Sequence, residues 1–144
     1  MGSILNKSII IRFFKFGAVG LLGVGVNLGA YTLLYEWFGL KDFLARILAI
    51  EISVLNNFAF NYLWTWGDRG RSWAGLPIRL LRYHGSTFIS SFVITLGIGW
   101  LVLQALPEQT PWMNYISHSA GIVAGMIVNY LMSDRWVFTM EKGV

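Results

Sequence analysis

Basic side chains at helical spacing are the residues of this sequence best suited to binding chemistry. Arg12 and Lys15 lie three positions apart before one apolar run, and Arg79 and Arg82 repeat the arrangement before another. Residues three apart share one face of a helix, so each pair can hold a phosphate or pyrophosphate through charge-assisted hydrogen bonds. The alternative is that these charges orient the chain in a membrane and attract anionic lipid headgroups.

Glu51 is a carboxylate inside an apolar run, about 12 Å from the outer end of that run. Ionisable side chains at such depth typically mark a substrate or proton pathway. The alternative is a protonated or paired structural residue, for which Arg46 is the candidate partner. Five positions separate Glu51 from Arg46, so a direct pair requires bent side chains. Asn27, in the preceding run, is expected at a similar depth and within reach of Glu51.

Asparagine side chains form the other polar group within the apolar runs. Asn57 and Asn61 lie four positions apart near the inner end of the second run, and Asn129 holds the corresponding place in the last run. With Asn27 they can line a polar path, or they can hold helices together by hydrogen bonds. Small-residue stripes at Gly25 with Gly29, and at Gly121 with Gly125, predict close-packing helix faces.

Several kinds of function are excluded by what the sequence lacks. It has no cysteine and only two histidines, with no spacing typical of a metal site, so we expect no metal or cofactor. No phosphate-binding loop or nucleophile elbow occurs, and the loops are too short for a catalytic domain, so we expect no enzyme. The net charge of +4 flanks apolar runs instead of forming a patch, which disfavours nucleic acid.

The elements that position these residues are membrane spans. Of 144 residues, 56% are hydrophobic and only 12% are charged, too few to coat a soluble globule. A span needs roughly 20 apolar residues. Four runs meet this length: 16–35, 43–66, 83–106 and 111–133. We predict an all-α integral membrane protein with four transmembrane helices, joined by loops at 39–42, 67–79 and 107–110.

The distribution of basic residues predicts the orientation of these spans. Nine of the eleven fall on one side: Lys7, Arg12, Lys15, Arg69, Arg71, Arg79, Arg82, Arg135 and Lys142. Only Lys41 and Arg46 fall on the other. Because basic residues are enriched in cytoplasmic segments, both termini are expected in the cytoplasm. Six tryptophans near span ends are expected in the headgroup layer: Trp37, Trp64, Trp66, Trp73, Trp112 and Trp136.

The sequence also indicates an internal duplication within a single membrane domain, residues 1–144. The basic opening at 12–16 recurs 67 residues later at 79–83, and the segment 57–66 aligns with 129–138, 72 residues later. The two expected repeats are about 12–66 and 79–138. Each crosses the membrane twice, so the repeats are expected to be parallel and related by a pseudo-twofold axis along the membrane normal.

Three segments resemble the GtrA-like family. They are R-F-F-K-F-G-A-V-G at 12–20, N-F-A-F-N-Y-L-W-T-W at 57–66 and N-Y-L-M-S-D-R-W-V-F at 129–138. The resemblance implies a four-span protein associated with movement of polyprenyl-phosphate-linked sugars across the cytoplasmic membrane. Family members commonly carry basic residues before the tryptophan of the first motif, where this chain has Tyr62 and Leu63. The second motif retains Arg135.

Two functions remain open at this point. In the first, the protein is a flippase whose basic residues capture the phosphate and whose Glu51 and asparagines line the path, with membrane lipids and a second copy of the chain as partners. In the second, it anchors or stabilises a membrane glycosyltransferase and moves nothing. A four-span drug exporter is disfavoured, because such proteins typically place their essential acid in the first span.

Overall fold

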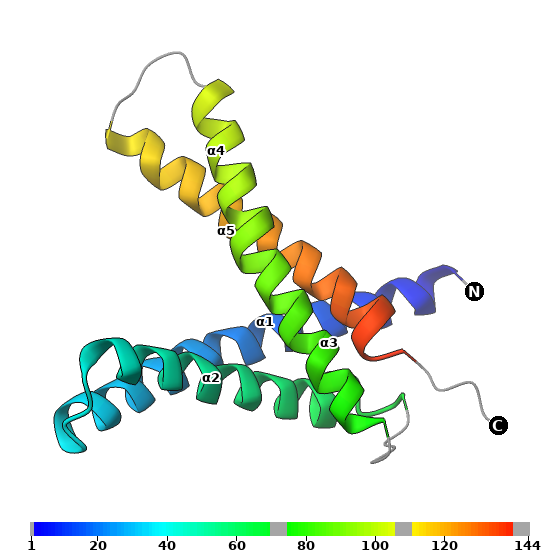
Figure 1. Ribbon diagram of the computed structural model, residues 1–144. Helices are drawn as coiled ribbons and strands as arrows, with labels where there is room; N and C mark the ends of the chain where they lie inside the picture. The colour runs from blue at the N-terminus through cyan, green and yellow to red at the C-terminus, as the bar shows by residue number, and fades with distance from the viewer. Residues whose placement is uncertain (1, 70–74, 106–110, 140–144) are drawn as a thin grey trace. The chain divides into compact units, whose positions relative to one another are not determined.

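The computed structural model describes residues 2–69, 75–105 and 111–139, and the elements in these ranges are helices (Figure 1). Four of them are long and apolar enough to cross a membrane: Lys7–Trp37, Asp42–Thr65, Leu76–Ala105 and Tyr115–Val137. The expected all-α, four-span architecture is confirmed to this extent. The chain divides into two compact units, Met1–Arg71 and Ser72–Val144.

Unit 1 is a helical hairpin. Its first arm is α1 (Gly2–Thr32) continued by the π-helical turn η1 (Leu33–Trp37), and its second arm is α2 (Asp42–Phe60) continued by the π-helical turn η2 (Asn61–Thr65). Gly39 has a φ of 65° in the connection. Only glycine adopts this left-handed conformation without strain, so Gly39 allows the chain to reverse within a few residues.

The two arms of unit 1 lie side by side because small residues let their backbones approach (Figure 1). Ala45 and Ala49 of α2 are fully buried. Ser53 donates a hydrogen bond of 2.8 Å to the carbonyl oxygen of Gly23, on α1. A Cβ added to Gly23 would lie 2.3 Å from the amide atoms of Asn57, so Gly23 is a point of closest approach.

Unit 2 is also a helical hairpin, but its first arm contains a π-helical turn within the span. This arm comprises α3 (Leu76–Phe88), the turn η3 (Ile89–Ile94) and α4 (Thr95–Ala105). The second arm is α5 (Pro111–Met132) continued by the π-helical turn η4 (Ser133–Val137). The arms pack through glycine: a Cβ on Gly121 would lie 2.2 Å from the Thr95 carbonyl oxygen, and one on Gly125 would lie 2.8 Å from that of Ser90.

The helices differ from the expected spans in length and in one aromatic position. The third span begins at Leu76, so residues 76–79 of the loop expected at 67–79 are helical. The loop expected at 107–110 and the predicted headgroup residue Trp73 lie outside the described residues. The headgroup position predicted for Trp66 is wrong. Its side chain is only 2% exposed, because the ring packs edge-on against Phe16, with centroids 5.8 Å apart.

Candidate functional site

The first basic pair lies beside the end of η2 in unit 1. Arg12 forms an ion pair with Asp68, just after η2. The Lys15 ammonium donates a hydrogen bond of 3.4 Å to the carbonyl oxygen of Trp64 and lies 5.2 Å from the centre of its ring. Both basic residues of this pair therefore contact the end of the second arm.

The second basic pair makes a related contact in unit 2. Arg82 donates a hydrogen bond of 3.3 Å to the carbonyl oxygen of Trp136. Arg82 follows Lys15 by 67 positions and Trp136 follows Trp64 by 72, the spacings of the two sequence matches. Arg79 differs from Arg12: it is only 5% exposed and counts among the buried residues of unit 2.

The chemistry of a helix end explains why cations gather here. The last carbonyl groups of a helix lack intrahelical donors and carry partial negative charge. Each second arm closes with a wide turn, in which the Trp66 amide donates to the Asn61 carbonyl at 2.9 Å and the Phe138 amide donates to that of Ser133 at 2.8 Å. A cation from the neighbouring arm then satisfies a nearby carbonyl, so Lys15 and Arg82 stabilise their hairpins besides being available to an anion.

The asparagines are placed along the interfaces between the arms. Asn61 is 1% exposed and accepts a hydrogen bond of 2.9 Å from Thr65. Asn129 accepts one of 3.1 Å from Ser86, across unit 2. The Oδ1 atom of Asn57 is buried and has no hydrogen-bond partner among the described residues. The Nδ2 atom of Asn56, a residue not predicted to belong to the site, is likewise buried without a hydrogen-bond partner among the described residues.

The remaining predicted site residues are spread over the surfaces of their units. Glu51 is exposed on α2, away from the buried positions Ala45 and Ala49, and Asn27 is half-buried on α1. Arg135 is exposed in η4. Among the described residues, no three histidine, aspartate or glutamate side chains are grouped closely enough to hold a metal ion.

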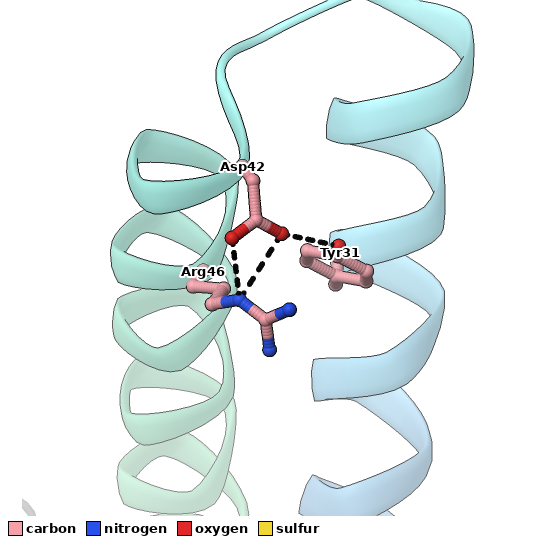
Figure 2. Close-up of polar contacts among 3 residues, drawn as sticks. All are labelled: Tyr31, Asp42 and Arg46. Carbon is pink, nitrogen blue, oxygen red and sulfur yellow. Dashed lines mark hydrogen bonds and ion pairs between the residues drawn. The ribbon is translucent and has the colours of Figure 1, made fainter.

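A polar cluster that sequence reasoning missed lies near the connection between the two arms of unit 1. Figure 2 shows its three residues, Tyr31, Asp42 and Arg46. Tyr31 donates a hydrogen bond of 2.6 Å to Asp42, and the Arg46 Nε donates to both Asp42 oxygens at 2.9 and 3.1 Å. Arg46 also lies over the Tyr31 ring, 5.0 Å from its centre. The carboxylate on Arg46 is thus Asp42, where the sequence had suggested Glu51. The four-residue spacing of Asp42 and Arg46 was the available signal.

Two grooves lie on the surfaces of the units. One, of about 490 Å³, lies in unit 1 and is lined by Ala18, Val19, Leu22, Phe60, Leu63 and Trp64. The other, of about 440 Å³, lies in unit 2 between α4 and α5, and Thr95, Ser117 and His118 are the polar residues of its lining. The first groove is wholly apolar and shares Trp64 with the Lys15 contact.

Fold and polar residues together define a multi-pass helical membrane protein, and comparison with known proteins gives its family. Residues 15–138 match the model of the GtrA/DPMS transmembrane domain, so the chain belongs to that family and the GtrA-like resemblance is confirmed. It is 34% identical over 125 residues to a dolichol-phosphate mannosyltransferase of Pyrococcus furiosus. The match covers 86% of this chain but only 33% of that relative, so this chain spans about a third of the relative's length.

Proposed function

We propose that this protein moves the phospho-sugar headgroup of a polyprenyl lipid across the cell membrane. The observation that carries the proposal is the presence of a cation, Lys15 or Arg82, at the corresponding end of each hairpin. Family membership and the similarity to a dolichol-phosphate mannosyltransferase support a lipid-linked sugar as the ligand. No enzymatic step is part of the proposal.

Catalysis of this movement consists of supplying polar partners to the headgroup. A phosphate is far too costly to pass through hydrocarbon without them. Lys15 in unit 1 and Arg82 in unit 2 each offer a phosphate the donors that their protein contacts leave available, since an ammonium has three and a guanidinium five. Arg79 and Arg135 add positive potential near Arg82 in unit 2, whereas the charge of Arg12 in unit 1 is balanced by Asp68. Asn27, Glu51 and the interface residues Asn57, Asn61 and Asn129 provide the polar groups farther along.

We further propose that the units are two parallel repeats with both termini in the cytoplasm. The nine-to-two distribution of basic residues supports the orientation, and the related Lys15 and Arg82 contacts support the duplication. Cysteines introduced at the exposed positions Lys41 and Thr139 test the orientation. A membrane-impermeant maleimide applied to intact cells is expected to label Lys41→Cys and to leave Thr139→Cys unlabelled. The reverse pattern would reject it.

A dimer is proposed as the working assembly. Gly25 and Gly29 of α1 have nothing within 4 Å of an added Cβ among the described residues, whereas Gly121 and Gly125 are already used inside unit 2. The open α1 face therefore remains available to a second copy, as small-residue faces in membranes commonly are. Native mass spectrometry from mild detergent should show dimers that Gly25→Leu reduces. Active preparations containing only monomer would contradict this.

The main function is tested by reconstitution of the purified protein in liposomes that contain a polyprenyl-phosphate sugar with a fluorophore on the sugar. Dithionite added outside the liposomes quenches only the fluorophores in the outer leaflet, unless the protein moves headgroups from the inner leaflet to the outer one. We expect wild-type protein to expose the inner pool and Glu51→Gln to slow this exposure, because a carboxylate on the path is replaced by an amide. Glu36→Gln, at an exposed position of η1, is the matched control. Equal rates for wild type and Glu51→Gln would reject a direct role of Glu51.

The second candidate function is a membrane anchor or stabilising subunit for a polyprenyl-phosphate glycosyltransferase. It is favoured by the fact that the curated relative is a mannosyltransferase of which this chain covers only a third. This function predicts no quenching of the inner pool by wild-type protein. It also predicts that the chain copurifies with a glycosyltransferase and raises the amount of that enzyme recovered in membranes.

A further inference from the structure

From the apolar groove of unit 1 and the cation at its end, we infer that unit 1 holds a polyprenyl monophosphate, with its first isoprene units in the groove and its phosphate on Lys15. This site deepens the proposed function, on which the choice of a prenyl chain rests. The groove has a volume of about 490 Å³ and six lining residues, all apolar or aromatic. Such a surface offers a branched hydrocarbon chain contact on both sides and offers a headgroup nothing.

Lys15 is placed on the same helical face as the α1 side of the groove. Ala18, Val19 and Leu22 follow it by three, four and seven positions, the spacing of neighbours along one face. A ligand whose chain lies along this face therefore brings its end to the ammonium. Trp64 belongs to both parts, because it lines the groove and its ring lies 5.2 Å from the Lys15 nitrogen.

The charge at this end fits a single phosphate. Arg12 is neutralised by Asp68, whereas the described contacts of Lys15 are with the carbonyl and ring of Trp64. Neither contact cancels its positive charge, and a 3.4 Å hydrogen bond to the carbonyl leaves two ammonium protons for an anion. A charge-assisted bond from Lys15 to phosphate is therefore compatible with the hairpin as it stands.

The corresponding positions of unit 2 carry different residues. Gly85 stands 67 positions after Ala18, and a Cβ built on it would lie 3.6 Å from the Trp136 ring. The Trp136 ring therefore lies within van der Waals range of α3, at the place that corresponds to Ala18 in the groove of unit 1. Leu63 corresponds to Arg135, a charged residue unsuited to a hydrocarbon chain. The tail site is accordingly assigned to unit 1, although both units carry a cation.

The test is photocrosslinking in phosphatidylcholine liposomes with a polyprenyl monophosphate that carries a diazirine on its second isoprene unit. Peptide mapping should place the label on α1 near Leu22 and on the segment 60–64. Leu22→Trp fills the groove from a position that is 45% exposed, so folding should be retained, and labelling should be lost. Ile89→Trp, the corresponding change in unit 2 at a 37% exposed position, should leave labelling intact.

Two further measurements test which lipid occupies the groove and whether the charge of Lys15 contributes to binding. Unlabelled polyprenyl phosphate should compete with the probe, whereas phosphatidylglycerol at the same concentration should not. Lys15→Gln should weaken binding about tenfold, as expected when one charge-assisted hydrogen bond is lost. Equal competition by phosphatidylglycerol, or labelling unchanged in either Leu22→Trp or Lys15→Gln, would overturn the assignment.

Failure of this binding site and failure of the proposed flippase function give different results. Specific labelling of the groove by a protein that exposes no inner-leaflet headgroup would keep the site and reject the flippase. Headgroup movement by a protein whose labelling is unaffected by Leu22→Trp would keep the flippase and reject the site.

Discussion

The two hairpins use the same kinds of residue at their closest approach, but on opposite arms. In unit 1 the glycine is Gly23 on the first arm, and the hydroxyl is that of Ser53 on the second. In unit 2 the position corresponding to Gly23 is Ser90, and the position corresponding to Ser53 is Gly125. One small residue facing one hydroxyl residue is thus common to both. The comparison shows that the closeness of the arms matters more than which arm carries the glycine.

The first arms also differ in backbone regularity at these two positions. Its first arm widens into the π-helical turn η3 where Ser90 lies, and Thr95 donates a hydrogen bond of 3.0 Å to the Ser90 carbonyl. α1 continues without such a turn past Gly23. Gly23 of unit 1 lies against the Asn57 side chain, while Gly121 of unit 2 lies against the main-chain carbonyl of Thr95 and Gly125 against the Thr95 hydroxyl and the Ser90 carbonyl. The two interfaces should therefore respond differently to added volume.

Gly121→Ala is expected to have the largest effect. Its Cβ would lie 2.2 Å from the Thr95 carbonyl oxygen and 3.1 Å from the carbonyl carbon, and a helix backbone cannot move aside without separating the arms. We expect a loss of about 3 kcal/mol in the free energy of unfolding, at the upper end of typical overpacking costs. Denaturation in mixed micelles, followed by circular dichroism, measures it. Gly97→Ala, where an added Cβ meets nothing within 4 Å, is the control and should not destabilise.

Gly23→Ala should cost less, because the obstructing group is a side chain. Its Cβ would lie 2.3 Å from the Asn57 amide, which can rotate at the expense of local packing. A loss of about 1 to 2 kcal/mol is expected, and the same unfolding assay applies. In the Asn57→Ala background the cost should shrink, since the obstruction is gone. Persistence of the full cost there would show that the α2 backbone, and not Asn57, sets the approach in unit 1.

The sequence was sufficient to predict the four spans, because lipid solubility is a property of composition and run length that needs no tertiary contact. It also identified Gly121 and Gly125 as a packing face. The sequence did not predict which glycine contacts the partner helix in unit 1, because that depends on how the two helices pack. The stripe at Gly25 and Gly29 has the expected spacing, yet the glycine that meets α2 is Gly23.

The burial of individual side chains could not be predicted from the sequence either. Trp66 was assigned to the headgroup layer from its place at a span end, but the wide turn of η2 directs it onto Phe16. Nothing local to Trp66 signals that turn. Arg79 and Arg12 look alike in the sequence, and only the packing of unit 2 makes Arg79 5% exposed. For the site, residue types were therefore predictable, whereas accessibility to a ligand was not.

Asp42→Asn should have the smallest effect and should concern unit 1 alone. The positions of unit 2 that correspond to Tyr31, Asp42 and Arg46 are Ile98, Asn114 and His118, which lack this charge pair. Replacing the carboxylate removes the charge that pairs with Arg46 but leaves an amide oxygen that can accept from Tyr31, so the midpoint of thermal unfolding should fall slightly. Because the Asp42 and Arg46 side chains are 50% and 62% exposed, water and salt weaken their attraction.

The difference in unfolding midpoint between wild type and Asp42→Asn should accordingly narrow in high salt. The control Glu36→Gln should unfold at the wild-type midpoint at either salt concentration. A difference that persists undiminished in high salt would mean that the hydrogen bond from Tyr31, and not the ion pair with Arg46, stabilises this end of unit 1.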